Sequence, residues 1–268
     1  GCPAPAFPSS IDVAVVGAGV IGLSIGWRLA SRGLSVAVFD RDEAGTGTSF
    51  AATGMLAAAA EHETGGDELL ALALESQRLW PAFRSAVEAA SHLAIDYRDE
   101  GTLLVALGRD EGERLRFRHE HQRRAGLATR WLSGPEVRRF EPGLRPSVAA
   151  GVLCPDDHQV DPRCLVAALV RVLRASGGLL FEHCPVTALA TAGGRTAGVT
   201  TAAGSCRAET VIVAGGVWSA DGLLPRGIDI PLRPLKGQAL ALRPPRQTCS
   251  LSHIFCTEQV HLAPKADG

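Results

Sequence analysis

The sequence lacks an excess of charge of either sign and any long hydrophobic run. Its 268 residues include 27 Lys and Arg and 28 Asp and Glu, which gives a net charge of −1. This balance does not favour binding to nucleic acid or to an anionic membrane surface. No apolar stretch approaches the roughly 18 residues that a membrane-spanning helix needs. Residues 1–10 lack the basic and apolar regions of a signal peptide. We therefore expect a cytoplasmic protein with no nucleic-acid or membrane partner.

Paired cysteines and clustered metal ligands are also lacking. The seven cysteines are odd in number, lie scattered along the chain and form no C-x-x-C pair. This usage favours reduced thiols in the cytosol over a disulfide framework. His119 and His121 form an isolated pair on a polar, helical-looking segment, where residues two positions apart do not face one another. We expect both histidines at the surface and no metal site.

The composition is otherwise that of an ordinary globular protein. Hydrophobic residues make up 46% of the chain and charged residues 21%. The length allows one large domain or two modest ones, with enough apolar residues for a core.

A glycine-rich turn joins a short apolar strand to a helix near the start of the sequence. Residues 11–16 form an apolar run with β-branched character, which predicts a buried strand. The three glycines of the G-x-G-x-x-G pattern that follows are Gly17, Gly19 and Gly22. The first permits the tight turn, the second lets the backbone approach a pyrophosphate, and the third lets helix and strand pack closely. The helix opened by Val20 and Ile21 would then offer N–H groups to the phosphates.

An acidic residue ends the second strand of this unit. We expect the helix to bury Ile21, Ile25 and Leu29 and to end at Gly33. Residues 35–39 form the next strand, and Asp40 follows it, where a carboxylate can accept hydrogen bonds from a ribose. The complete pattern predicts a dinucleotide-binding unit.

The next hundred residues alternate between apolar and polar segments. The small-residue stretch 46–63 includes three side chains that we expect to be buried, which are Phe50, Met55 and Leu56. A helix is expected over 67–90, and its inner face is predicted to contain Leu69, Leu72, Leu74, Leu79, Phe83 and Val87. A strand pair is expected over 92–107 around a turn at 99–101. Polar helices are expected over about 109–125 and 134–140.

The last hundred residues predict a helix and several strands. Asp161 and Pro162 are typical of a helix start, and this helix should reach the glycines at 177–178. The strands expected after it are 179–186, 197–201, 205–208 and 210–213. Val260, Leu262 and Ala263 predict a strand that enters a turn without a return strand. A lone hairpin arm leaves backbone groups unpaired, so we expect the C-terminal part of the fold to be missing.

Four segments carry a resemblance to a known family. In chain order they are VVGAGVIGLSIGWRLA with VFD, TSFAATGMLAAAAE with SQRLW, FEHCPV, and VIVAGGVWS with PLKGQAL. The sequence resembles the FAD-dependent amine and amino-acid oxidases of the D-amino-acid oxidase superfamily, and most of all the glycine oxidases of thiamine biosynthesis. The second segment is much more specific than the glycine pattern alone.

The resemblance implies an α/β fold with two discontinuous domains. A Rossmann-like FAD-binding domain would comprise residues 1–85 and 149–225. A second, α+β substrate domain built on a mainly antiparallel sheet would comprise residues 86–148 and 226–268.

The resemblance also implies a set of FAD-binding residues. Thr48 and Ser49 follow a glycine-containing loop, where their hydroxyls could bind the second phosphate, although a helix N-cap would account for one of them. Gly54 would admit the flavin ring to the backbone. The full predicted set is Gly17, Gly19, Val20, Ile21, Gly22, Asp40, Arg41, Thr48, Ser49, Thr53, Gly54, Met55, Val186, Gly215 and Gly216. Trp218, beside the last two glycines, is expected in the core.

One predicted substrate contact departs from the family. His261 stands where family members have a tyrosine over the substrate, and an imidazole can still donate or accept a hydrogen bond there. An ordinary exposed strand histidine is the alternative. The arginine that binds the substrate carboxylate in the family has no counterpart in this chain. We therefore do not expect the chain by itself to oxidise glycine efficiently.

The implied activity is oxidation of a small amine or amino acid such as glycine, sarcosine or a small D-amino acid. Hydride would pass from the substrate Cα to flavin N5, the resulting imine would hydrolyse to an oxo acid, and dioxygen would be reduced to hydrogen peroxide. The alternatives are a dehydrogenase that passes electrons to a quinone or partner protein, and a catalytically incompetent FAD-binding fragment. The sequence leaves open whether the protein forms a homo-oligomer.

Overall fold

The computed structural model describes residues 6–63, 66–220, 222–224, 228–243 and 251–267. Their contacts divide them into two compact units. The first lies within Gly1–Ala52, Val87–Leu93 and Pro162–Ala239, and the second within Thr53–Ala86, Ala94–Asp161 and Leu240–Gly268. These ranges differ from the predicted domains over residues 53–85 and 149–161, among others. The two compact units are defined by contacts, whereas the predicted domains are defined by the ligand that each would bind. The predicted domains therefore stay a prediction.

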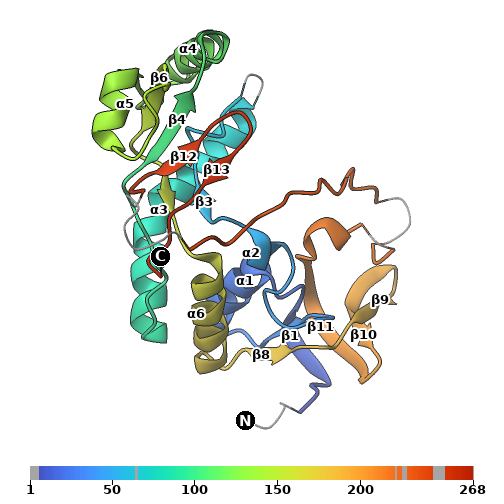
Figure 1. Cartoon of the computed structure of the whole chain (residues 1–268). Coiled ribbons are helices and arrows are strands. Elements are labelled where there is room, and N and C mark those ends of the chain that lie inside the picture. The colour runs from blue at the N-terminus through green and yellow to red at the C-terminus, as the bar shows by residue number, and fades with distance from the viewer. Residues whose placement is uncertain (1–5, 64–65, 221, 225–227, 244–250, 268) are drawn as a thin grey trace. The chain divides into compact units, whose positions relative to one another are not determined.

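The first unit is built on a six-stranded mixed sheet in the order β8-β2-β1-β11-β10-β9 (Figure 1). Its strands are β1 (Ser10–Val16), β2 (Val36–Phe39), β8 (Leu179–Phe181), β9 (Val186–Ala192), β10 (Arg195–Thr201) and β11 (Gly204–Val213). The helical segments are α1 (Val20–Ala30), α2 (Thr48–Ala51), α6 (Pro162–Ala175) and the 3-10 turn Gly216–Trp218. β1 pairs in parallel with both β2 and β11, and β2 pairs in parallel with β8.

The apolar character of β1 explains its place inside this sheet. Ala14 and Val15 have no exposed surface, and neither does Phe39 at the end of β2. The middle of a strand that is paired on both edges and buried in the sheet is expected to be apolar. The predicted strand–helix–strand order is therefore confirmed, and so is the predicted fold class.

The buried face of α1 is not the predicted one. Ile21 is 63% exposed, and the residues buried on this helix are Gly22, Leu23, Gly26, Trp27 and Ala30. The reason is the close packing of the helix on the strands. A Cβ at Gly26 would lie 2.8 Å from a methyl group of Val38, so glycines mark the packed face where the prediction relied on branched aliphatic residues.

Two strand predictions in this unit also need correction. The expected strand 179–186 is divided into β8 and the start of β9, because residues 182–185 form a turn between them. The separate strands expected at 205–208 and 210–213 are one long strand, β11. Residues 204–207 pair with β10 and residues 207–213 with β1, so the strand stays extended through Glu209.

The second unit contains a five-stranded sheet in the order β13-β12-β4-β6-β5. Its strands are β4 (Thr102–Ala106), β5 (Arg130–Ser133), β6 (Ala150–Cys154), β12 (Ile254–Cys256) and β13 (His261–Leu262). β4 and β12 pair in parallel, whereas the other pairs are antiparallel. A small two-stranded sheet of β3 (Met55–Leu56) and β7 (His158–Gln159) lies in the same unit. Its helices are α3 (Asp67–Ser91), which ends in segments assigned to the first unit, α4 (Arg109–Arg124) and α5 (Gly134–Phe140).

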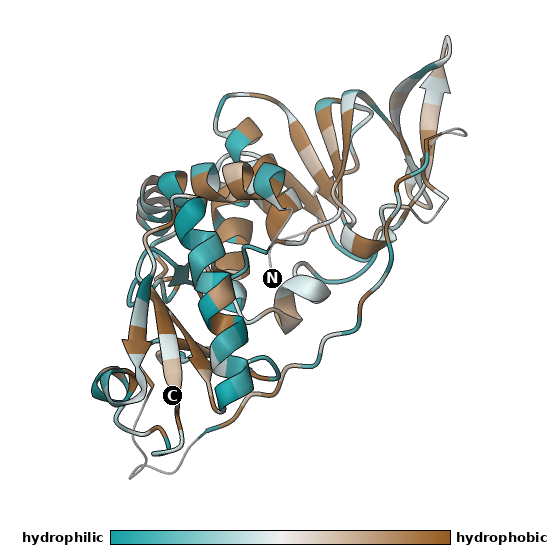
Figure 2. Ribbon diagram, turned by 90° about the horizontal axis from the view of Figure 1, so that it is seen from above, coloured by the Kyte–Doolittle hydropathy of each residue, from teal (hydrophilic) through white to brown (hydrophobic). Residues whose placement is uncertain are grey.

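The strands of this second sheet are rich in hydrophobic residues, which appear brown on the ribbon in Figure 2. Leu103, Val152 and Ile254 come from three adjacent strands and are 1% exposed or less. The predicted strand pair over 92–107 is wrong in its first half. Tyr97 lies in no strand, and Arg98 makes only an isolated bridge to Gln159, so β4 finds its partners far along the chain.

The inner face of α3 also differs from the prediction. Leu69, Leu72 and Leu79 are 70%, 68% and 49% exposed, and Leu74 is exposed too. Two predicted residues, Phe83 and Val87, do lie on the more buried side of the helix. The other residues of that side are Leu70, Ala73, Gln77 and Trp80, and the whole set recurs every three or four residues. The predicted stripe grouped leucines that do not share a helix face.

A buried carboxylate fixes the turn that follows β3. Asp157 has no exposed surface, and its two oxygens accept hydrogen bonds of 2.9 Å from the N–H groups of Ala59 and Ala60. Burial raises the pKa of Asp157 to about 6, although these two hydrogen bonds oppose the rise.

None of the helices in the described part of the chain is long and apolar enough to cross a bilayer.

Candidate functional site

The glycine turn after β1 has no room for side chains. Gly17 has φ of +109°, and a Cβ there would lie 2.4 Å from the carbonyl oxygen of Ala214. A Cβ at Gly22 would lie 1.9 Å from the carbonyl oxygen of Gly17. Both positions therefore require glycine. No side chain covers the backbone of these two residues at the carboxyl end of β1.

The N-terminus of α1 is held by a serine from another segment. Gly19 is the N-cap and makes no side-chain capping bond. The N–H of Val20 instead donates to Ser49 Oγ at 3.0 Å. This contact brings together two predicted FAD-binding residues that are separated by 29 positions in the chain. Helix N-termini favour anions because their first N–H groups lack helical partners.

Asp40 lies directly beside this helix start. Its Oδ2 accepts a hydrogen bond from the N–H of Ala18 at 2.6 Å, and its Oδ1 accepts one from the N–H of Asp42 at 3.0 Å. Each carboxylate oxygen has a second lone pair. The acid can therefore bind its own loop and a ligand hydroxyl at the same time.

Arg41 and Trp218 make a contact that the sequence did not predict. The guanidinium of Arg41 lies 4.3 Å from the centre of the Trp218 ring and 3.2 Å from a carboxylate oxygen of Asp42. Trp218 is 42% exposed, so its expected place in the core is wrong. It follows β11, at the sheet edge where Asp40 follows β2, and no spacing rule links the two positions.

The remaining predicted residues of the first unit surround the same strand ends less closely. Thr48 and Ser49 begin the short helix α2, whose N-cap is Gly47. Gly216 has φ of +57°, and a Cβ there would meet no described atom within 4 Å. Val186 begins β9, which is separated from β1 by β11 and β10. Phe50, expected to be buried, is 58% exposed because the short α2 turns it outward, near Arg163.

The predicted flavin-ring residues lie in the second unit. Gly54 has φ of +82°, and its carbonyl accepts a hydrogen bond of 2.9 Å from the N–H of Val160. Met55 pairs with Gln159 in the small sheet. Lys265 donates to the carbonyl of Thr53 at 2.7 Å and to that of Val160 at 3.1 Å. No sequence pattern pointed to Lys265, because its partners are more than a hundred positions away.

His261 lies on β13, opposite Cys256 of β12, and is exposed. Its predicted contact with substrate stays a prediction.

The histidine pair on α4 does not lie at the surface as expected. His119 is partly buried, and its Nδ1 lies 3.0 Å from the hydroxyl of Thr129. His121 is also partly buried, and its Nε2 is enclosed and has no hydrogen-bond partner. The helix is packed against the sheet on this side, so a polar sequence does not make both faces exposed.

Three parallel strands therefore end at one edge with a bare glycine turn, a helix N-terminus and an acid. This arrangement defines a dinucleotide-binding protein of the α/β class. The family model described as FAD dependent oxidoreductase matches residues 12–268. The chain belongs to this family.

The relatives include glycine oxidases. The chain is 32% identical over 257 residues to glycine oxidase of Geobacillus kaustophilus, which covers 95% of this chain and 67% of that protein. It is 33% identical over 262 residues to the bifunctional protein ThiO/ThiG of Synechocystis, which covers 96% of this chain and 37% of that protein. The crystal structure of the Geobacillus kaustophilus enzyme matches with a TM-score of 0.81 at 28% identity, over 96% of this chain and 69% of that one. The resemblance inferred from the sequence is confirmed.

The residues present fit the cofactor of the family, which is FAD. A Cβ at Gly17 or Gly22 would overlap neighbouring backbone atoms, so the turn presents only backbone to a ligand. Asp40 and the start of α1 lie next to this turn. The chain spans about two thirds of the length of the glycine oxidases that it matches.

Proposed function

We propose that the protein is an FAD-dependent oxidase of a small amine or amino acid, with glycine, sarcosine and small D-amino acids as the substrate class. The observation that carries the proposal is the pairing of Asp40 with the glycine turn, in a chain about 30% identical to glycine oxidases over nearly its whole length. The reaction is proposed for the whole protein, whereas FAD binding is proposed for this chain.

The first unit would bind the nucleotide part of FAD. The N–H groups at the start of α1 would meet the pyrophosphate, with Ser49 beside them. Asp40 would accept a hydrogen bond from the adenosine ribose, and Arg41 would lie next to the adenosine. Thr48, Val186, Gly215 and Gly216 complete the proposed set in this unit. These residues all lie within the predicted FAD-binding domain, residues 1–85 and 149–225, which we retain as a proposal.

Segments of the second unit would bind the flavin and the substrate. Thr53, Gly54 and Met55 would lie along the ring, and Lys265 holds the carbonyl of Thr53 in this segment. His261 would donate a hydrogen bond to the substrate carboxylate or accept one from its amine. Bound FAD supplies the hydride acceptor, while the protein orients the substrate and excludes water.

Two measurements test this proposal. The purified chain should take up FAD at one equivalent and show the visible spectrum of a protein-bound oxidised flavin. The whole protein should then produce hydrogen peroxide with glycine, sarcosine or D-alanine. Turnover with an artificial quinone in place of dioxygen would assign it to the dehydrogenases. A chain that takes up no FAD would overturn the proposal.

A further inference from the structure

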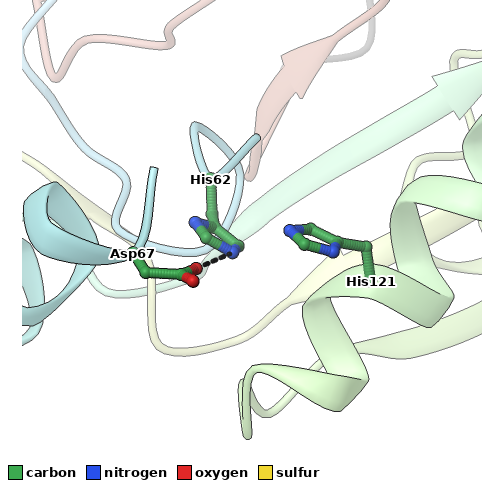
Figure 3. Close-up of side chains that lie close together, drawn as sticks. All are labelled: His62, Asp67 and His121. Atoms are coloured by element: carbon green, nitrogen blue, oxygen red, sulfur yellow. Dashed lines mark ion pairs between the residues drawn. The ribbon is translucent and has the colours of Figure 1, made fainter. Parts of the chain in front are cut away.

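A cluster of two histidines and an aspartate, none of them among the proposed FAD-binding residues, lies in the second unit. His62 follows the turn after β3, Asp67 is the first residue of α3, and His121 lies on α4 (Figure 3). One potential ligand atom from each residue lies within 4.8 Å of the other two. The Nε2 of His62 is 3.9 Å from Oδ1 of Asp67.

Both histidines have a buried nitrogen without a hydrogen-bond partner. The His62 side chain is 1% exposed, and the Nε2 atoms of His62 and His121 are enclosed and make no hydrogen bond. The rings are nearly parallel, with centres 4.9 Å apart. Leaving a buried polar atom unpaired costs about 1–3 kcal/mol. A histidine that serves only to fill a core normally has its nitrogens satisfied, so two such atoms side by side indicate a missing ligand.

We propose that His62, Asp67 and His121 bind a divalent transition-metal ion, for which Zn²⁺ is the best match. Two imidazole nitrogens and one carboxylate oxygen are a donor set that Zn²⁺ accepts, and three protein ligands leave a fourth position for water or another group. The three residues come from three different elements, so the ion would join the turn after β3 to α3 and α4.

The surroundings allow an ion to enter and a fourth ligand to reach it. His62 lines two cavities of about 480 and 280 Å³, and Glu63 lines both. Glu61 lines the larger cavity. Arg118, which lines the smaller one, donates a hydrogen bond to the carbonyl of Ala60. The two glutamates would offset its positive charge near the ion.

A modest movement would complete the coordination. Bonds of about 2.0–2.2 Å to Zn²⁺ require ligand atoms that are closer together than the present limit of 4.8 Å. Asp67 can supply part of this movement because its side chain is 84% exposed. Rotation of the His121 ring on α4 would supply the rest.

Calorimetric titration of the chelator-treated chain with Zn²⁺ tests the site. We expect one tight equivalent, and Co²⁺ bound in its place should show the absorption of a low-symmetry nitrogen and oxygen site. His121→Asn and Asp67→Asn should each weaken Zn²⁺ binding at least about tenfold. The matched controls are His119→Asn on the same helix and Glu68→Gln beside Asp67, and both should leave the affinity unchanged.

Thermal unfolding separates binding from folding. Without metal, His121→Asn should unfold at nearly the same temperature as the parent chain, and added Zn²⁺ should stabilise the parent alone. Absence of a tight equivalent would overturn the proposal. Equal affinity in His121→Asn would do so too, because the ion would then be bound elsewhere, for example at cysteine thiols. None of these readouts depends on FAD or on turnover.

Discussion

Asp40 Oδ2 and the N–H of Ala18 are joined by a hydrogen bond of 2.6 Å. The acid after β2 thus fixes the glycine turn after β1, and the two halves of the nucleotide-binding pattern hold one another in place. The geometry that would receive a pyrophosphate is therefore formed by the chain itself.

Asp40→Ala should weaken FAD binding about 10- to 100-fold. The substitution removes a charged acceptor for the ribose and leaves the N–H of Ala18 unpaired, and losses of this kind cost about 1–3 kcal/mol. Titration of the apoprotein with FAD measures the effect. Asp12→Ala is the control, because Asp12 also accepts hydrogen bonds from a neighbouring strand end, at Ser35. Unchanged affinity in Asp40→Ala would remove Asp40 from the site.

Two helical glycines should respond to alanine in opposite ways. Gly22→Ala should cost about 3 kcal/mol or more, because the new Cβ would overlap the carbonyl of Gly17. Gly112→Ala on α4 meets no atom within 4 Å and should stabilise the protein by about 0.5–1 kcal/mol. Urea unfolding of both variants measures these changes. A stable Gly22→Ala would mean that α1 packs less closely than described.

Native cysteines should differ sharply in reactivity. Burial raises the pKa of the Cys154 thiol and raises that of Cys256 to about 12, whereas Cys164 on α6 is exposed. The thiolate is the reactive form, so iodoacetamide should label Cys164 before Cys154 and Cys256. Peptide mass spectrometry before and after addition of urea identifies the sites. Native labelling of Cys154 at the rate of Cys164 would contradict the packing of β6.

The ionisation of Asp157 should lower stability as pH rises. Its pKa is about 6 in the folded chain against a usual value of 3.8, so between these values the folded state binds the extra proton. Because one pKa unit corresponds to about 1.4 kcal/mol, the free energy of unfolding should fall by about 3 kcal/mol from this group between about pH 4 and pH 6, and change little above.

Asp157→Asn removes this contribution, so its stability relative to the parent chain should improve with pH. Urea unfolding at several pH values gives the difference between the two curves. Asp156→Asn, at an exposed neighbouring position, is the control and should follow the parent. Parallel curves for the parent and Asp157→Asn would show that the buried carboxyl titrates normally.

Local patterns predicted the parts of the fold that local physics determines. The β1–α1–β2 unit, the long helices and the start of α6 at Pro162 follow from periodicity, glycine turns and capping. The face of α1 was mispredicted because close packing selects Gly22 and Gly26 over Ile21. The error arises because contacts between elements, which local patterns do not encode, decide which helix face is buried.

The candidate sites show the same division. Asp40 and the glycines lie within one short motif, so their proximity could be predicted from the sequence. The contacts of Lys265 with Thr53 and of His62 with His121 join distant segments. No spacing in the sequence identifies such pairs, because the intervening chain decides where each partner lies.

The parallel pairing of β12 with β4 has a consequence for synthesis on the ribosome. Ile254 pairs with Thr102 and Cys256 with Leu104, so one edge of β4 stays open until more than half of the chain has been added after it. An open apolar edge is prone to pair with other chains. Nascent chains that stall before Ile254 should therefore depend on chaperones, while the β1–α1–β2 unit has already emerged.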